Sequence, residues 1–334
     1  MKALVVHSPH HASVEEVPVP IPGEGEVVIR VKACGICGTD YHIFEGAFLS
    51  PYPIIPGHEF AGVVSEVGPG VTTFAKGDRV TADPTLYCGE CEYCLTKRVN
   101  HCKRWGALGN TTAGSLAEYV KVPARNVVRL PYTMSFAQGA FVEPVACVVH
   151  GMNRLQVQAC DTVLLFGAGA MGLQLVQAIA RSGAADLVVV DVASDKLDWA
   201  KRLGATRCVL SQDVGTELGR DYPDGFDIVV DATGIPAVIE QAFDYMGKTA
   251  KFLQFGVAPK DSSISMSPFT IYNKDWTILG SMAVNNTFLP ALRWVREGRI
   301  KVDELVTHRV KLDEVPDLLA KPKASAMLKA QVVF

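Results

Sequence analysis

The stretch "TVLLFGAGAMGLQLVQAIA", Thr162 to Ala180, decides the fold of this chain. Its nineteen residues carry no charge, and that length is close to the length of a membrane-spanning helix. A membrane helix would not usually carry three glycines within six residues, followed by Gln174 and Gln177. The pattern instead predicts a short buried strand, a glycine turn and a helix with one apolar face. Such a segment is half of a dinucleotide-binding unit.

Apolar, strand-like runs alternate with helical patterns on either side of this turn. Segments such as "SDKLDWAKRLGA" at 194–205 have the 3.6-residue period of an amphipathic helix. The predicted strands cover 162–166, 187–191, 207–210, 226–233, 250–256 and 276–280. Six strands joined by helical crossovers predict an α/β fold with a doubly wound parallel sheet.

The first part of the chain has a different pattern. Residues 1–145 are punctuated by Gly and Pro and contain strands such as "EVVIRVKAC" and "EFAGVVSEVG", with few helices. We therefore expect a β-rich domain at 1–145, the doubly wound domain at 146–281, and a segment at 282–334 that returns to the first domain. A length of 334 residues suits two domains.

Composition narrows the possible partners and the compartment. A formal net charge of −3 argues against a nucleic acid or an acidic membrane surface, because both bind clustered Lys and Arg. The N-terminus "MKALVVHSPHH" has an apolar run too short for a signal peptide, so a cytoplasmic location is expected. In a reducing compartment, nine cysteines are more plausibly metal ligands or packed thiols than a disulfide framework.

Four cysteines lie in "CGECEYCLTKRVNHC", within a lobe at about 85–105. Cys88, Cys91, Cys94 and Cys102 have the spacing C-x2-C-x2-C-x7-C, which lets one loop surround a tetrahedral Zn²⁺. An iron–sulfur cluster is the alternative, although the fourth ligand and flanking Pro of the bacterial ferredoxin pattern are missing. His101 could replace Cys102 but is the weaker choice. A closed four-thiolate site predicts a structural zinc.

A second group of ligand-type residues is spread over three segments. The segments "CGICGTDYH", "PGHEF" and "FVEPVAC" supply Cys37, His58, Glu59 and Glu143. A catalytic zinc needs about three protein ligands and an open position, and these residues meet that need.

These segments allow other interpretations. Cys34 and Cys37 could form a redox dithiol, but their setting is not the strand-to-helix turn of a thioredoxin-type motif. The metalloprotease motif H-E-x-x-H is absent because position 62 is Gly. Cys147 competes with Glu143 as a ligand. Pro144 predicts an extended backbone at Glu143, and Cys147 is interpreted as a thiol that packs near the nicotinamide.

The glycine turn carries the cofactor prediction. In "GAGAMG", Gly167 permits the tight turn, Gly169 lets the backbone approach a pyrophosphate, and Gly172 allows close packing of helix and sheet. Asp191 ends the next strand and favours NAD over NADP, while Lys196 could tolerate a 2′-phosphate. The other predicted cofactor residues are Ala170, Met171, Phe255, Gly256, Val257, Ser281 and Met282.

These motifs, in this order, carry a resemblance over nearly the whole chain. It resembles the zinc-containing medium-chain alcohol dehydrogenases, and among them the sorbitol and polyol dehydrogenases. The resemblance implies a GroES-like catalytic domain, a Rossmann domain, a homo-oligomer (dimer or tetramer) and two zinc ions per subunit, one catalytic and one structural. It also implies that Thr39 and His42 form a proton relay and that Asp40 is a partner of His58. Several animal polyol dehydrogenases lack the four lobe cysteines, which this chain keeps.

The expected activity follows from the resemblance. We expect oxidation of a secondary hydroxyl of a polyol to the ketose, with hydride transfer to NAD. L-threonine and a sugar or polyol phosphate are the alternative substrates, because the ligand motifs are shared across these enzymes. A zinc-lobed binding protein without turnover would explain Cys88 to Cys102 but not the open site at Cys37, His58 and Glu143.

Overall fold

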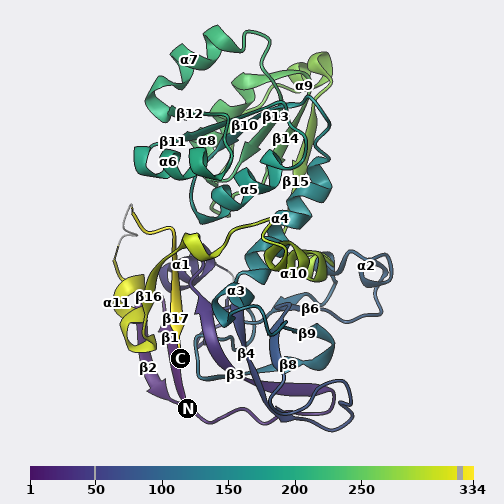
Figure 1. Cartoon of the computed structure of the whole chain (residues 1–334), viewed down its shortest axis with the longest axis vertical. Coiled ribbons are helices and arrows are strands. Elements are labelled where there is room, and N and C mark those ends of the chain that lie inside the picture. Colours follow the sequence, from purple (N-terminus) through teal and green to yellow (C-terminus); the bar gives the residue numbers. More distant parts are fainter. Residues whose placement is uncertain (49, 322–325) are drawn as a thin grey trace. The chain divides into compact units, whose positions relative to one another are not determined.

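The computed structural model describes residues 1–48, 50–321 and 326–334. The chain divides into two compact units, Met1–Ala146 together with Val284–Phe334, and Cys147–Ala283. Both termini lie in the first unit (Figure 1). The first unit is therefore assembled from two segments that are separated in the sequence by the second.

The second unit is built on a parallel sheet in the order β12-β11-β10-β13-β14-β15. All five neighbouring pairs are parallel, which confirms the predicted doubly wound sheet. Its strands are β10 (Thr162–Phe166), β11 (Asp186–Asp191), β12 (Arg207–Leu210), β13 (Phe226–Asp231), β14 (Met246–Gln254) and β15 (Thr277–Gly280). Its helices are α5 (Ala170–Ala180), α6 (Ser194–Leu203), α7 (Val214–Asp221), α8 (Pro236–Ala242) and α9 (Pro268–Lys274).

The uncharged stretch folds as strand β10, a glycine turn and helix α5. Gly167 has a φ of 100°, in the region that favours glycine. A Cβ at Gly172 would overlap the carbonyl oxygen of Gly167, so the helix can start this close to the strand only with glycine there. None of the helices in the described part of the chain combines the length and apolar content needed to cross a membrane.

The first unit contains a seven-stranded sheet in the order β16-β17-β3-β4-β5-β9, with β8 also paired to β3. In Figure 1 the yellow strand β17 lies beside the purple strand β3, because the C-terminal segment pairs antiparallel with the N-terminal one. The sheet strands are β3 (Glu26–Gly35), β4 (Glu59–Val67), β5 (Arg79–Ala82), β8 (Tyr119–Pro123), β9 (Val127–Arg129), β16 (Val306–Val310) and β17 (Lys329–Val333).

Shorter elements complete the first unit. Two small antiparallel sheets pair β1 (Lys2–Ser8) with β2 (His11–Glu16), and β6 (Thr85–Leu86) with β7 (Gly106–Ala107). The helices that lie wholly in this unit are α1 (Gly38–Glu45), α2 (Glu92–Leu95), α3 (Phe136–Ala140), α10 (Phe288–Arg296) and α11 (Val315–Leu319). Each unit has its own apolar core, the first around Ile29, Phe60 and Leu116, the second around Leu164, Phe226 and Phe252.

Helix α4 (Val142–Leu155) corrects one prediction about the backbone. Glu143 was expected to be extended because Pro144 follows it, but the structure places both residues in the first turn of α4. A proline in the first turn does not break a helix, because the first N–H groups have no partner inside the helix anyway. Glu143 therefore approaches its neighbours from a helix start.

Candidate functional site

The four lobe cysteines lie together around a common centre. Their sulfur–sulfur distances are 3.8 Å (Cys88–Cys94), 3.6 Å (Cys91–Cys94), 4.0 Å (Cys91–Cys102) and 3.5 Å (Cys88–Cys102). Sulfurs about 2.3 Å from a tetrahedral Zn²⁺ would be about 3.8 Å apart, so the cage has the dimensions of a zinc site. All four thiols are free of disulfide bonds. His101 is not in this group, and its ring contacts Tyr93 instead.

Backbone amides favour a thiolate at Cys88, whereas desolvation opposes one at Cys94. The N–H of Cys91 donates to Cys88 Sγ, and the N–H of Arg104 donates to Cys102 Sγ. Amides of Glu90 and Cys91 lower the pKa of Cys88 to about 6, whereas desolvation raises that of Cys94 to about 12. Zinc takes thiolates as ligands. A bound zinc would therefore stabilise the thiolate form of all four cysteines and remove the difference in pKa between Cys88 and Cys94.

The second ligand group brings together three of the four residues predicted to hold the catalytic zinc. Ligand atoms of Cys37, His58 and Glu59 all lie within 4.8 Å of one another. Cys37 is the N-cap of α1, and Glu59 is the first residue of β4, directly after His58. His58 and Glu59 are buried, and His58 Nδ1 has no hydrogen-bond partner among the described residues. A buried nitrogen without a partner beside a thiol and a carboxylate fits a zinc ligand.

Glu143 is the fourth predicted ligand, and it lies close to this group without belonging to it. Burial raises the pKa of Glu143 to about 7, with His58 opposing the shift and Glu59 adding to it. Burial alone would lower the pKa of His58, but Cys37, Glu143 and Asp40 hold it well above its usual value. Anionic groups thus converge on His58, and the site attracts positive charge.

Asp40 connects the two segments that carry Cys37 and His58. It is fully buried, and its carboxylate accepts hydrogen bonds from the N–H of Cys37 (2.7 Å) and of Gly57 (3.1 Å). Burial raises the pKa of Asp40, although His58 opposes that shift. Asp40 is thus linked to His58 partly through the backbone N–H of Gly57, the residue before His58.

The predicted relay residues both lie on α1. Thr39 Oγ1 lies 3.7 Å from Cys37 Sγ, which places the hydroxyl beside the candidate metal ligands. His42 is half-buried in the same helix.

One buried cation, Lys329, was not predicted from the sequence. Lys329 Nζ lies 2.6 Å from Glu59 Oε1 and 3.2 Å from the carbonyl oxygen of Ile36. Burial opposes the charge of Lys329, but Glu59 and Cys37 raise its pKa above the usual value. A lysine inside the apolar run "MLKAQVV" was the available signal, because such a strand seldom buries a charge without a partner.

The predicted cofactor residues of the second unit lie at one edge of its sheet. Phe166, Asp231, Gln254 and Gly280 are partners in neighbouring strands, so the loops that follow them leave the same carboxyl edge. Dinucleotides bind at this edge of doubly wound sheets. The N-cap of α5 is Gly169, which has no side chain to cap the helix, so first-turn N–H groups are available for a phosphate. These loops carry Gly167, Phe255, Gly256, Val257, Ser281 and Met282.

Asp191 is held by the backbone on both sides. It is the last residue of β11, and its carboxylate accepts from the N–H of Ala168 (2.7 Å) and of Ala193 (3.0 Å). The bond from the N–H of Ala168 connects Asp191 to the glycine turn. Lys196 lies nearby in sequence, in the first half of α6, and is half-buried.

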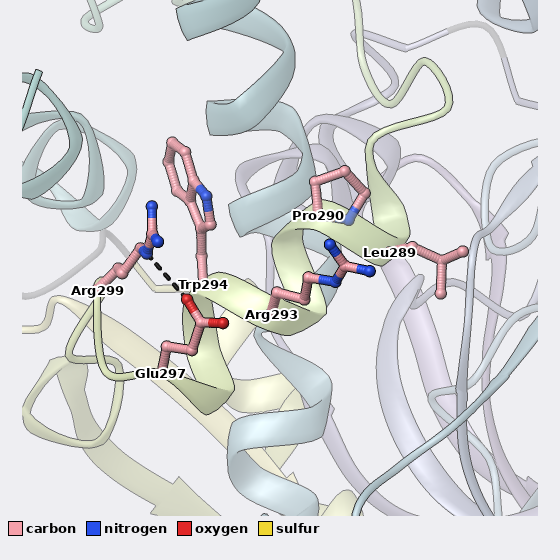
Figure 2. A pocket seen from close by; sticks show the side chains of 6 residues that line it. All are labelled: Leu289, Pro290, Arg293, Trp294, Glu297 and Arg299. Atoms are coloured by element: carbon pink, nitrogen blue, oxygen red, sulfur yellow. Dashed lines mark hydrogen bonds and ion pairs between the residues drawn. The ribbon is translucent and has the colours of Figure 1, made fainter.

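A surface pocket of the first unit runs along α10 and the turn after it. Figure 2 shows the side chains that line it, with Glu297 hydrogen-bonded to Arg299 at 3.0 Å. None of the candidate ligand or cofactor residues is among them. The lining residues are Leu289, Pro290, Arg293, Trp294, Glu297 and Arg299.

The doubly wound sheet and the two clusters of ligand-type residues define a zinc-dependent oxidoreductase. Family models agree: residues 23–132 match the alcohol dehydrogenase GroES-like domain, and residues 170–297 match the zinc-binding dehydrogenase model. The chain belongs to the zinc-containing medium-chain alcohol dehydrogenases, in their polyol branch.

Relatives of known name match over nearly the full length. D-arabinitol dehydrogenase 1 of Uromyces fabae is 33% identical, over 99% of this chain and 97% of its own. D-altritol 5-dehydrogenase of Agrobacterium fabrum is 34% identical, over 96% of each chain. A zinc-binding dehydrogenase of Sinorhizobium meliloti 1021, crystallised with NADP, is 34% identical with a TM-score of 0.95, over 100% of this chain and 99% of its own. The predicted family and fold class are confirmed.

Proposed function

We propose that this enzyme oxidises a secondary hydroxyl of a sugar alcohol to the ketose and transfers the hydride to NAD, with one catalytic and one structural zinc per subunit. The group of half-buried Cys37 with buried His58 and Glu59, with Glu143 beside it, is the observation that carries the proposal. The arabinitol and altritol dehydrogenases named above support the substrate class.

The residues of the site have distinct tasks in this proposal. When bound, zinc supplies Lewis-acid polarisation of the hydroxyl, and the nicotinamide accepts hydride. Cys37, His58 and Glu143 hold the metal, and Asp40 fixes the spacing of the first two by accepting from the N–H groups of Cys37 and of Gly57, which precedes His58. Thr39 accepts the hydroxyl proton, and His42 passes it to solvent, since imidazole gains and loses protons readily near neutral pH.

The choice of NAD rests on Asp191. A carboxylate at the end of β11 can accept hydrogen bonds from ribose hydroxyls and would repel a 2′-phosphate. The Sinorhizobium relative was crystallised with NADP, and Lys196 is the nearby cation in this chain that could tolerate a phosphate. Both cofactors therefore belong in the test.

We also propose a homo-oligomer, a dimer or a tetramer, located in the cytoplasm. The edge strand β15 exposes 43% of Ile278, and α9 exposes 69% of Phe269 and 83% of Tyr272. An edge strand and large apolar side chains that face solvent are common at subunit interfaces. Light scattering coupled to gel filtration would measure the subunit count.

The test of the activity is a panel of initial rates. C4 to C6 polyols, L-threonine and sugar or polyol phosphates are assayed with NAD and NADP in parallel. We expect the highest kcat/KM with a polyol and NAD. Activity confined to primary alcohols would overturn the proposal, and a preference for threonine or a phosphate would reassign the substrate. No turnover despite full zinc content would favour a binding role.

A further inference from the structure

A buried carboxylate joins the loops at the carboxyl edge of the second unit. Asp231 is the last residue of β13, and none of its surface is exposed. Its Oδ1 accepts from the N–H (3.1 Å) and the hydroxyl (2.6 Å) of Thr233. Its Oδ2 accepts from the N–H of Gly234 (2.9 Å) and from Gln254 Nε2 (2.9 Å). Four donors therefore converge on one carboxylate.

The same residue holds the loop that follows β14. The carbonyl oxygen of Asp231 accepts from the N–H of Phe255 (3.0 Å) and of Gly256 (2.8 Å). A Cβ at Gly256 would come within 2.6 Å of Asp231 Oδ2, so this approach requires glycine. The carbonyl oxygen of Gln254 in turn accepts from the N–H of Ser281, which follows β15. The loops after β13, β14 and β15 are thus connected through Asp231 and its partner Gln254.

Asp231 also holds Thr233, which lies beside the glycine turn that follows β10. The N–H of Ala232 donates to the carbonyl oxygen of Phe166 at 2.9 Å. Thr233, held by Asp231, lies so close to the turn that a Cβ at Gly167 would be 3.0 Å from its Cγ2 methyl. The shape of the phosphate-binding turn therefore depends on where Thr233 is held.

We propose that Asp231 is a positioning residue for the nicotinamide cofactor, holding the loops that contact it without touching it. The inference rests on the proposed function, which places the cofactor at this edge. Only a carboxylate suits the position, because both oxygens accept from two donors each. An asparagine would turn its NH₂ group toward the N–H of either Thr233 or Gly234, and one backbone donor would lose its acceptor in either orientation.

The test measures cofactor binding separately from turnover. For Asp231→Asn we expect the Kd for NADH, from fluorescence titration, to rise about tenfold or more, as one lost acceptor for a buried donor predicts. Zinc content is expected to stay at the wild-type value, and kcat at saturating cofactor to stay within about threefold, since the loops still close around a bound cofactor. A merely structural role would lower the melting temperature without this separation of Kd from kcat.

Asp227→Asn is the matched control. Asp227 lies near the amino end of the same strand, β13. Its carboxylate accepts from the N–H and the hydroxyl of Thr162. We expect this variant to lose stability without a change in the Kd for NADH. Equal effects of both variants on the Kd would overturn the inference.

A milder variant covers the case in which Asp231→Asn does not fold. Thr233→Val keeps the shape of the side chain and removes one of the four donors, together with the acceptor of the Ile235 N–H, so we expect the Kd for NADH to rise about threefold. Unchanged cofactor affinity in every folded variant would overturn the inference while leaving the proposed function intact. A wild-type protein that binds neither NADH nor NADPH would overturn both.

Discussion

The ammonium of Lys329 lies 2.6 Å from the carboxylate of Glu59, and both side chains are buried, with 5% and 2% of their surface exposed. Their charges are compensated by each other inside the first unit. Glu59 therefore has a partner before any metal binds. Burial is the main cause of the raised pKa of Glu143, and the charges of His58 and Lys329 oppose that shift. Because Lys329 already compensates the charge of Glu59, we expect Glu59 to be a transient ligand of a bound zinc.

Breaking this pair should be costly for stability. In Lys329→Met the Glu59 charge stays buried without its partner, and we expect a loss of about 3–5 kcal/mol in the free energy of unfolding, measured with urea. The double variant Lys329→Met/Glu59→Gln should recover most of that loss, because no charge remains uncompensated. Equal stability of the single and double variants would contradict the role of the pair.

The third zinc ligand can be identified by metal analysis. We expect Glu143→Ala to lose the catalytic zinc or most of kcat. Cys147→Ala, one helical turn later on α4, should keep two zinc ions per subunit and much of its activity. The reverse pattern would place the cysteine in the ligand shell and relate the site to the ethanol-type enzymes.

Glu143 should also make the metal-free protein sensitive to pH. Its pKa of about 7 in the folded state exceeds the ordinary value of 4.5, so the folded state holds a proton that the unfolded state has released. Stability is then greatest below pH 4.5 and falls as the pH rises through 7. We expect this fall, up to about 3 kcal/mol, to be absent in metal-free Glu143→Gln. If the free energy of unfolding changed with pH in the same way for the wild type and Glu143→Gln, another group would be responsible.

The lobe zinc should act on folding more than on chemistry. Structural zinc contributes folding free energy of order 10 kcal/mol, so Cys91→Ser should lower stability or assembly more than turnover per folded, zinc-replete site. Cys160→Ser is the control, since Cys160 is exposed and outside the lobe. A stable, zinc-replete Cys91→Ser protein without any turnover would mean that the two zinc sites are reversed.

Cofactor preference should follow Asp191. Asp191→Ala removes the repulsion of a 2′-phosphate together with the ribose contacts, so the ratio of kcat/KM for NAD to that for NADP should fall. Affinity for both cofactors should also drop, because the bond to the N–H of Ala168 in the glycine turn is lost. Lys196→Ala is the companion variant and should lower NADP use alone. Unchanged selectivity in Asp191→Ala would remove this residue from cofactor recognition.

Features encoded within a short stretch were predictable from the sequence. The sheet of the second unit follows from apolar runs separated by helical periodicity, and the cysteine cage from spacing within fifteen residues. Lys329 was missed because its partner is 270 residues away, and no local pattern encodes such a pairing. Asp231 was missed because "FDIVVDATG" reads as an ordinary strand end until the neighbouring loops are placed around it.

The backbone conformation predicted for Glu143 was wrong. The preference of a residue before proline for extended conformations led to the prediction at Glu143, but Pro144 lies in the first helical turn. There the geometry of the helix start outweighs the general preference.

The pairing of β17 with β3 also sets an order of events during synthesis. The ribosome releases Met1–Ala146 first, yet the sheet of that unit stays open beside β3 until residues 284–334 have been made. Throughout that interval Glu59 is without its ammonium partner, Lys329. The nascent first unit therefore has an exposed strand edge during that interval, and such an edge can pair with other chains.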